Sequence, residues 1–149
     1  MKLEVPKIVR SLHLSDYAES MGEQVVTVWV NPPADLLRTR DELVRSVYEK
    51  SLEAARETLS DENLTADALL ERAMRSLGDV LSEDEANELD AQMHAWLATI
   101  WSQGGDVWTV DDVAELQADC RATDPYLMTW LSQRTRQMIH AHRIGAKKN

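Results

Sequence analysis

The sequence predicts a mostly helical protein with a small β-hairpin at its N-terminus, in which about five helices pack as a compact bundle. The β-branched and aromatic run from Val25 to Val30 is typical of a buried strand. Asn31 and two prolines end that strand, because proline fixes φ and has no backbone N–H. Beyond them, apolar residues recur at three- and four-residue steps, which is the period of an amphipathic helix.

The segment 2–14 is expected to pair with this strand. It is apolar at alternate and nearby positions, although Pro6 indicates an edge strand or a break near its start. Turn residues and Gly22 fill the connection over 15–23, so the two segments form a hairpin or a small ribbon. A lone hairpin is barely stable in water, so we expect it to lie on the helices. Residues 1–33 then form the hairpin or extended segment, residues 34–149 the helical domain, and the two together one folding unit.

Helix-start signals divide the rest of the chain. Ser82 with Glu85 is a capping box, Thr109 with Asp112 is a similar start, and Asp124 precedes a proline at the first helical position. Gly104-Gly105 ends the helix between the first two starts, and the last helix is expected to fray after Arg143 into GAKKN. The expected helices cover 34–59, Thr65 to near Gly78, Ser82 to Trp101, Thr109 to Cys120, and Asp124 to Arg143.

The hairpin and the helices are expected to share one core. The hairpin contributes Val25, Val28, Trp29 and Val30, and the helices contribute Trp96, Leu97, Ile100, Trp130 and Leu131. Cys120 continues an apolar stripe and is expected to behave as a small buried hydrophobe.

Composition limits the partners and the compartment. The net charge of −10 argues against nucleic acid and against an anionic membrane as partners. The apolar runs are too short to span a bilayer, and the start of the chain lacks the apolar core of a signal peptide. One cysteine cannot form an intrachain disulfide, which fits a reducing cytoplasm.

The residues predict no catalytic, cofactor-binding or metal-ligating set. His140 and His142 are two positions apart on a helix, so they point in different directions and cannot chelate one ion. The carboxylates of the first helical turns are explained by capping. No glycine-rich phosphate loop and no nucleophile elbow is found. We therefore expect a protein that is not an enzyme and needs no cofactor.

Five residues are candidates for contact with a protein partner: Trp108, Trp101, Arg134, Arg136 and Arg143. Trp108 lies just before a helix start, and tryptophan is enriched at binding hot spots. Trp101 also falls on an apolar stripe, so core packing is its alternative role. The arginines belong to a basic C-terminal region, which either complements the helix dipole or docks an acidic partner.

Three strings carry a family resemblance: SLHLSDYAESMGEQVVTVWVNPP at 11–33, WTVDDVAELQADC at 108–120, and TDPYLMTWL at 123–131. With the basic end GAKKN, they resemble the tail assembly chaperones of long-tailed bacteriophages and their prophages. The resemblance covers both ends of the chain, and the helical middle, 41–90, adds nothing to it.

The resemblance implies a non-enzymatic protein that binds the tape measure protein, keeps it soluble and helps recruit tail tube subunits. Such chaperones are absent from the finished virion. The resemblance also implies a programmed ribosomal frameshift near Lys147-Lys148. The frameshift would make a C-terminally extended form of the chain, which is a further expected partner. Two alternatives stay open: a structural tail or head–tail connector protein, which mature particles would contain, and a small regulatory or antitoxin-like binding protein.

Overall fold

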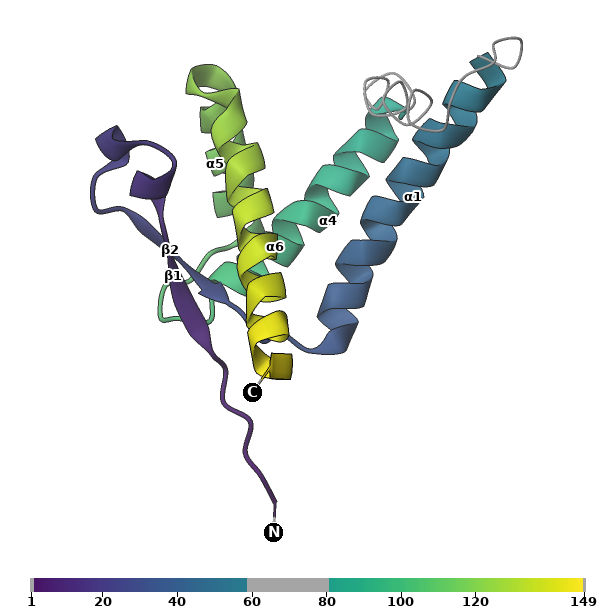
Figure 1. Cartoon of the computed structure of the whole chain (residues 1–149). Coiled ribbons are helices and arrows are strands. Elements are labelled where there is room, and N and C mark those ends of the chain that lie inside the picture. Colours follow the sequence, from purple (N-terminus) through teal and green to yellow (C-terminus); the bar gives the residue numbers. More distant parts are fainter. Residues whose placement is uncertain (1, 59–80, 149) are drawn as a thin grey trace. The chain divides into compact units, whose positions relative to one another are not determined.

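The computed structural model describes residues 2–58 and 81–148 (Figure 1). These residues are mostly helical and include one two-stranded antiparallel hairpin, as predicted. Four α-helices lie in the described residues, and the helix expected between Thr65 and Gly78 lies outside them. The elements in chain order are β1 (Val9–His13), η1 (Leu14–Asp16), η2 (Glu19–Met21), β2 (Val25–Trp29), α1 (Ala34–Thr58), α4 (Glu83–Trp101), α5 (Val110–Thr123) and α6 (Pro125–Lys148).

The chain divides into two compact units. Unit 1 comprises Met1–Pro33 and Met93–Asn149, and unit 2 comprises Ala34–Gln92. The expected boundary after Pro33 coincides with one division between the units, and the other division falls inside α4, before Met93. The hairpin therefore shares a unit with the second half of α4 and with α5 and α6. Whether the whole chain unfolds as one cooperative unit stays a prediction.

Asn31 closes the open end of the hairpin in unit 1. Its side-chain oxygen accepts hydrogen bonds from the Ile8 N–H at 2.6 Å and from the Trp29 indole N–H at 3.0 Å. Its amide nitrogen donates to the Pro6 carbonyl at 3.0 Å. The first strand begins only at Val9, so the proline marks a break before the strand. One polar residue thus satisfies backbone groups that the short ladder leaves unpaired.

The core of unit 1 joins the inner face of the hairpin to the three helices. Period-2 alternation sends every second residue of each strand inward, and α6 contacts β2. Val25 and Trp130 were expected in this core, and both expectations were wrong. Val25 is 45% exposed, because it lies on the outward face of the hairpin, opposite His13. Trp130 is only half-buried. Trp29 is also half-buried. The buried side chains are Leu12, Leu14, Val26, Val28 and Val30 from the hairpin, and Trp96, Leu97, Ala98, Ile100, Trp101, Val113, Cys120, Met128, Leu131, Thr135 and Ile139 from the helices.

The helix starts predicted at Ser82, Thr109 and Asp124 are confirmed, and the one at Thr65 lies outside the described residues. The Ser82 hydroxyl accepts from the Glu85 N–H at 3.1 Å, and the Glu85 carboxylate accepts from the Ser82 N–H at 3.4 Å. Asp124 accepts from the Tyr126 N–H at 3.2 Å, which caps α6. The predicted end of α6 was wrong, because the helix continues through Gly145 to Lys148. Glycine ends a helix when it takes a positive φ, and Gly145 does not.

The capping box of α5 makes a testable contribution to stability. The Thr109 hydroxyl accepts from the Asp112 N–H at 3.1 Å, and the Asp112 carboxylate accepts from the Thr109 N–H at 2.8 Å. Thr109→Ala should destabilise the protein by about 1 kcal/mol, the usual cost of losing an N-cap. Chemical denaturation measures this loss, and an unchanged midpoint would contradict the capping role.

The same box predicts a dependence on pH. The hydrogen bond from the Thr109 backbone N–H, helped by the Thr109 side chain, lowers the pKa of Asp112 from its ordinary value of 3.8. Because the folded state lowers this pKa, the stabilisation is complete above the ordinary value and is lost as the pH falls through the folded-state value. Asp112→Asn should therefore reduce stability at pH 7, and the difference from the wild type should shrink in acid.

Candidate functional site

The two candidate tryptophans pack against each other in unit 1. Trp101 is fully buried, and its indole N–H donates to the Thr135 hydroxyl at 3.1 Å. Trp108 is half-buried and meets Trp101 edge-on, with ring centroids 5.2 Å apart. The Ser102 hydroxyl accepts from the Trp108 N–H at 2.8 Å and so fixes the connection between α4 and α5. Trp101 therefore belongs to the core, and Trp108 presents only part of its ring to solvent.

The three candidate arginines lie on different sides of α6. Arg134 is half-buried, whereas Arg136 and Arg143 are exposed. With 3.6 residues per turn, Arg136 and Arg143 fall roughly 160–200° around the helix from Arg134. Arg134 shares its side with Met138 and His142, at steps of four residues. The basic C-terminal region is therefore two separate surfaces.

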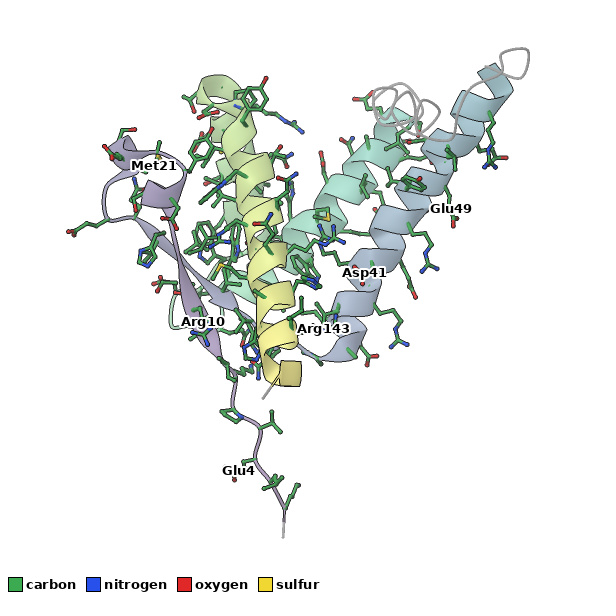
Figure 2. The ribbon with its side chains drawn as sticks, viewed as in Figure 1. Glu4, Arg10, Met21, Asp41, Glu49 and Arg143 are labelled. Carbon is green, nitrogen blue, oxygen red and sulfur yellow. The ribbon has the colours of Figure 1, made fainter. Side chains whose placement is uncertain are left out.

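Arg134 lines a groove between β1 and α6, which we call the β1–α6 groove. Its volume is about 720 Å³, and the residues that line it are Val9, Arg10, Ser11, His13, Arg134, Met138, Ala141, His142 and Gly145. Every one belongs to unit 1. Figure 2 shows Arg10 on strand β1. Figure 1 shows that β1 and α6 run in opposite directions, because the start and the end of unit 1 lie at the same end of that unit.

The charge of the groove is opposite to that of the chain. Among the described residues, two arginines and two histidines line it and no carboxylate does, although the whole chain has 26 aspartates and glutamates and only 16 lysines and arginines. Because no described carboxylate lines the groove, its arginines are available to an external anionic group. One hydroxyl, two imidazoles and two guanidinium groups line the groove, which suits an acidic peptide.

Sequence reasoning found one of the four basic residues of this groove. Arg134 was a candidate, whereas Arg10, His13 and His142 were not. The expectation that His140 and His142 point apart agrees with their environments, because His142 lines the groove and His140 is exposed. The missed residues have no local motif, and only the packing of α6 beside β1 brings them together.

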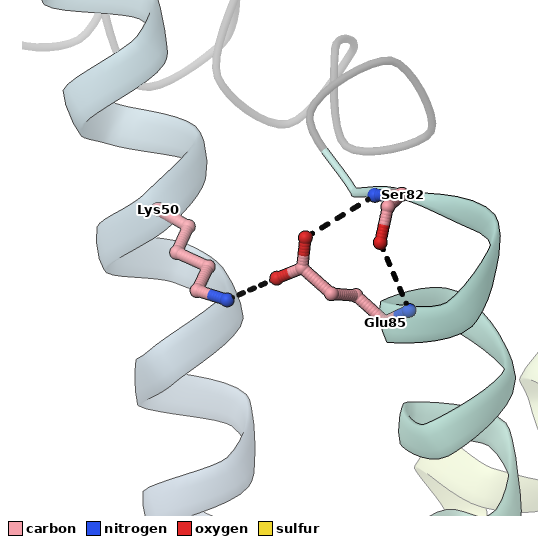
Figure 3. Close-up of polar contacts among 3 residues, drawn as sticks. All are labelled: Lys50, Ser82 and Glu85. Atoms are coloured by element: carbon pink, nitrogen blue, oxygen red, sulfur yellow. Dashed lines mark hydrogen bonds and ion pairs between the residues drawn. The ribbon is translucent and has the colours of Figure 1, made fainter.

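A second hollow in unit 2 is less suited to binding an anion. It has a volume of about 340 Å³, and Lys50 faces Asp84, Glu85 and Glu88 in it. Figure 3 shows the Glu85 carboxylate between the Lys50 ammonium group and the Ser82 N–H. The hydrogen bond from Lys50, together with the contacts from Ser82, lowers the pKa of Glu85. The cation of this hollow is thus already paired with a carboxylate.

Two titratable groups elsewhere in unit 1, Tyr17 and Cys120, have pKa values raised by their surroundings. The Tyr17 hydroxyl donates to the Asp124 carboxylate at 2.7 Å, and this hydrogen bond raises the pKa of Tyr17. The Tyr17 ring also meets Trp130, with centroids 5.3 Å apart. Burial raises the pKa of the Cys120 thiol, which disfavours the reactive thiolate. Residues 2–58 and 81–148 hold no group of three histidine, cysteine or acidic side chains arranged to bind a metal.

Comparison of the chain with models of protein families, with curated proteins and with solved structures finds no match. Across the described residues, no helix is both long enough and apolar enough to cross a membrane. The β1–α6 groove is therefore identified from its geometry and charge alone.

Proposed function

We propose that this chain is a non-enzymatic tail assembly chaperone of a long-tailed bacteriophage or prophage, which binds the tape measure protein and helps recruit tail tube subunits. The observation that supports this proposal best is the basic β1–α6 groove on an acidic protein. A chaperone must hold its partner and later release it. Charged contacts that water can reach suit this purpose, because they speed association and contribute modest affinity.

The resemblance at 11–33, 108–120 and 123–131 supplies the choice of partner. The first of these strings contains part of β1 and all of β2, and the last contains the start of α6. Of the three strings, the first therefore supplies groove residues, Ser11 and His13, and the last begins the helix whose later turns line the groove. The protein acts in the host cytoplasm and leaves the particle before the tail is complete.

The proposal includes a C-terminally extended form made by ribosomal slippage. The extension would follow Lys147-Lys148, beyond the last apolar residue, Ile144, where added sequence does not disturb the core. Two lysines in a row suit an A-rich slippery sequence. We expect an AAA codon at Lys147, an alanine codon ending in A before it, and an overlapping frame in the −1 register.

Co-expression with fragments of the tape measure protein tests the proposed function. The full chain should co-purify with at least one fragment and raise its soluble fraction, without added nucleotide or metal. Mass spectrometry of mature particles should not detect the chain. Failure to co-purify with any fragment, combined with detection in mature particles, would favour a structural tail protein instead.

A further inference from the structure

The outer edge of β1 has backbone groups that β2 does not use. In the hairpin, the Val30 N–H donates to the Ile8 carbonyl at 2.9 Å, and the Leu14 N–H donates to the Gln24 carbonyl at 3.0 Å. Residues of an antiparallel pair alternate between hydrogen-bonded and non-hydrogen-bonded positions. The backbone N–H and C=O groups of Arg10 and Leu12 therefore point toward β2, and those of Val9, Ser11 and His13 point away from it.

These three residues also line the β1–α6 groove. The described residues contain a sheet of two strands only, so no third strand covers this edge. From Val9 to His13 the strand extends about 13 Å, and the stretch of α6 from Arg134 to Gly145 extends about 16 Å. The two sides of the groove, β1 and this stretch of α6, are therefore similar in length. Each is long enough to lie along an extended segment of about five residues.

The positive charge of the groove favours a segment with acidic side chains. Arg10 lies on the same face of β1 as buried Leu12, two positions along, and so projects toward the side where α6 packs. Arg134 and His142 come from the facing helix. A segment with carboxylates at alternate positions would place them all on one face, beside the two arginines and His142.

Pairing between two copies of β1 is disfavoured by the same charges. An antiparallel pair of such strands would bring Arg10, His13 and the basic side of α6 from both copies together, without any carboxylate from the groove. Charged residues on an edge strand can also serve only to prevent aggregation. That simpler role predicts no specific binding of acidic peptides, so the two explanations differ in a measurable way.

We propose that the β1–α6 groove binds an extended acidic segment of a partner protein, which adds to β1 as the third strand of the sheet. The inference rests on the proposed partner-binding function, but not on the identity of the partner. The backbone groups of Val9, Ser11 and His13 supply the ladder hydrogen bonds, and Arg10 and Arg134, with His142 beside them, select for acidic side chains.

Fluorescence anisotropy with a synthetic peptide tests the proposal on the full chain. The probe is a labelled seven-residue peptide of alternating glutamate and valine. One control has lysine in place of glutamate, and another is N-methylated on the peptide bonds that would face β1. The glutamate probe should bind, and either control should bind at least about tenfold more weakly, a difference of about 1.4 kcal/mol.

Matched variants of α6 locate the binding site. Arg134→Glu should weaken binding of the glutamate probe about tenfold, because it places a carboxylate in the groove. Arg136→Glu makes the same charge change on an exposed residue outside the groove and should leave the affinity within about twofold. Circular dichroism should give the wild-type spectrum for both variants.

Several results would overturn the proposal. Equal binding of the N-methylated peptide would exclude strand addition, and equal losses in the two variants would indicate attraction to overall charge. Tighter binding of single-stranded DNA of equal length, or self-association through β1, would identify a different occupant. If the tape measure protein co-purifies with Arg134→Glu as well as with the wild type while the glutamate probe does not bind the wild type, the strand proposal fails and the proposed function stands.

Discussion

Trp101→Ala should produce the largest loss of stability of any single substitution in the core of unit 1. The Trp101 side chain is fully buried, contacts Trp108 and donates a buried hydrogen bond to Thr135. Truncating a buried tryptophan costs about 3–5 kcal/mol, which is a large part of the stability of a small domain. Thermal unfolding should show a large drop in Tm. A melting curve like that of the wild type would remove Trp101 from the core.

Trp130→Ala provides the comparison. The sequence predicts Trp130 in the same core, but the structure leaves Trp130 half-buried against Tyr17. Because less apolar surface is removed from water, its truncation should cost clearly less than that of Trp101. Equal losses of stability in the two variants would show that the depth of burial does not determine the cost of truncating these tryptophans.

A double-mutant cycle tests the buried hydrogen bond even if Trp101→Ala does not fold. The Thr135 hydroxyl accepts from Trp101 at 3.1 Å and donates to the Leu131 carbonyl at 2.7 Å. Thr135→Val leaves the buried indole N–H without this partner and should cost about 1–3 kcal/mol. In a Trp101→Phe background, the same substitution should cost less, because the N–H is no longer there. Additive costs would mean that the hydrogen bond contributes nothing.

Gly104→Ala should also destabilise unit 1, through a steric clash rather than a cavity. An added Cβ at Gly104 would lie 2.1 Å from the Thr27 methyl carbon and 2.9 Å from the Thr27 Cβ. Threonine in a strand has few alternative rotamers, so the turn after α4 or strand β2 must move. Overpacking of this kind costs about 1–3 kcal/mol, and so close a contact predicts the upper end.

Two further variants isolate that contact. Gly145→Ala adds the same atom on α6, where nothing lies within 4 Å, and should stabilise the protein by about 0.5–1 kcal/mol. Thr27→Ala removes the nearest atom and should recover part of the loss caused by Gly104→Ala. Full additivity of the Gly104 and Thr27 substitutions would contradict the predicted clash.

The elements that the sequence predicted well are those set by local patterns. The Val25–Val30 run, the prolines after Asn31 and the capping residues Thr109 and Asp124 depend on near neighbours, and the structure has β2 and the helix starts there. Local patterns predicted less well how deeply a residue is buried. Trp101 and Trp130 both lie on apolar stripes, and only the packing of neighbouring elements makes one fully buried and the other half-buried.

The groove could not be predicted, because its residues come from segments more than 100 positions apart. Arg10 and His13 read as strand residues, and His142 reads as a solvated helical residue. Their shared role depends on which side of α6 packs beside β1, and on a free strand edge that only the register defines. The sequence does not predict the continuation of α6 to Lys148, because a glycine near the end of an apolar stripe is typical of a helix end.

Amide hydrogen exchange along β1, with and without the glutamate–valine peptide, tests directly whether the free edge accepts a partner strand. The amides of Arg10 and Leu12 face β2 and should be protected in both states. The amides of Val9, Ser11 and His13 face the groove and should become slower to exchange only when the peptide is bound. Unchanged exchange at these three amides under saturating peptide would show that the segment does not pair with β1.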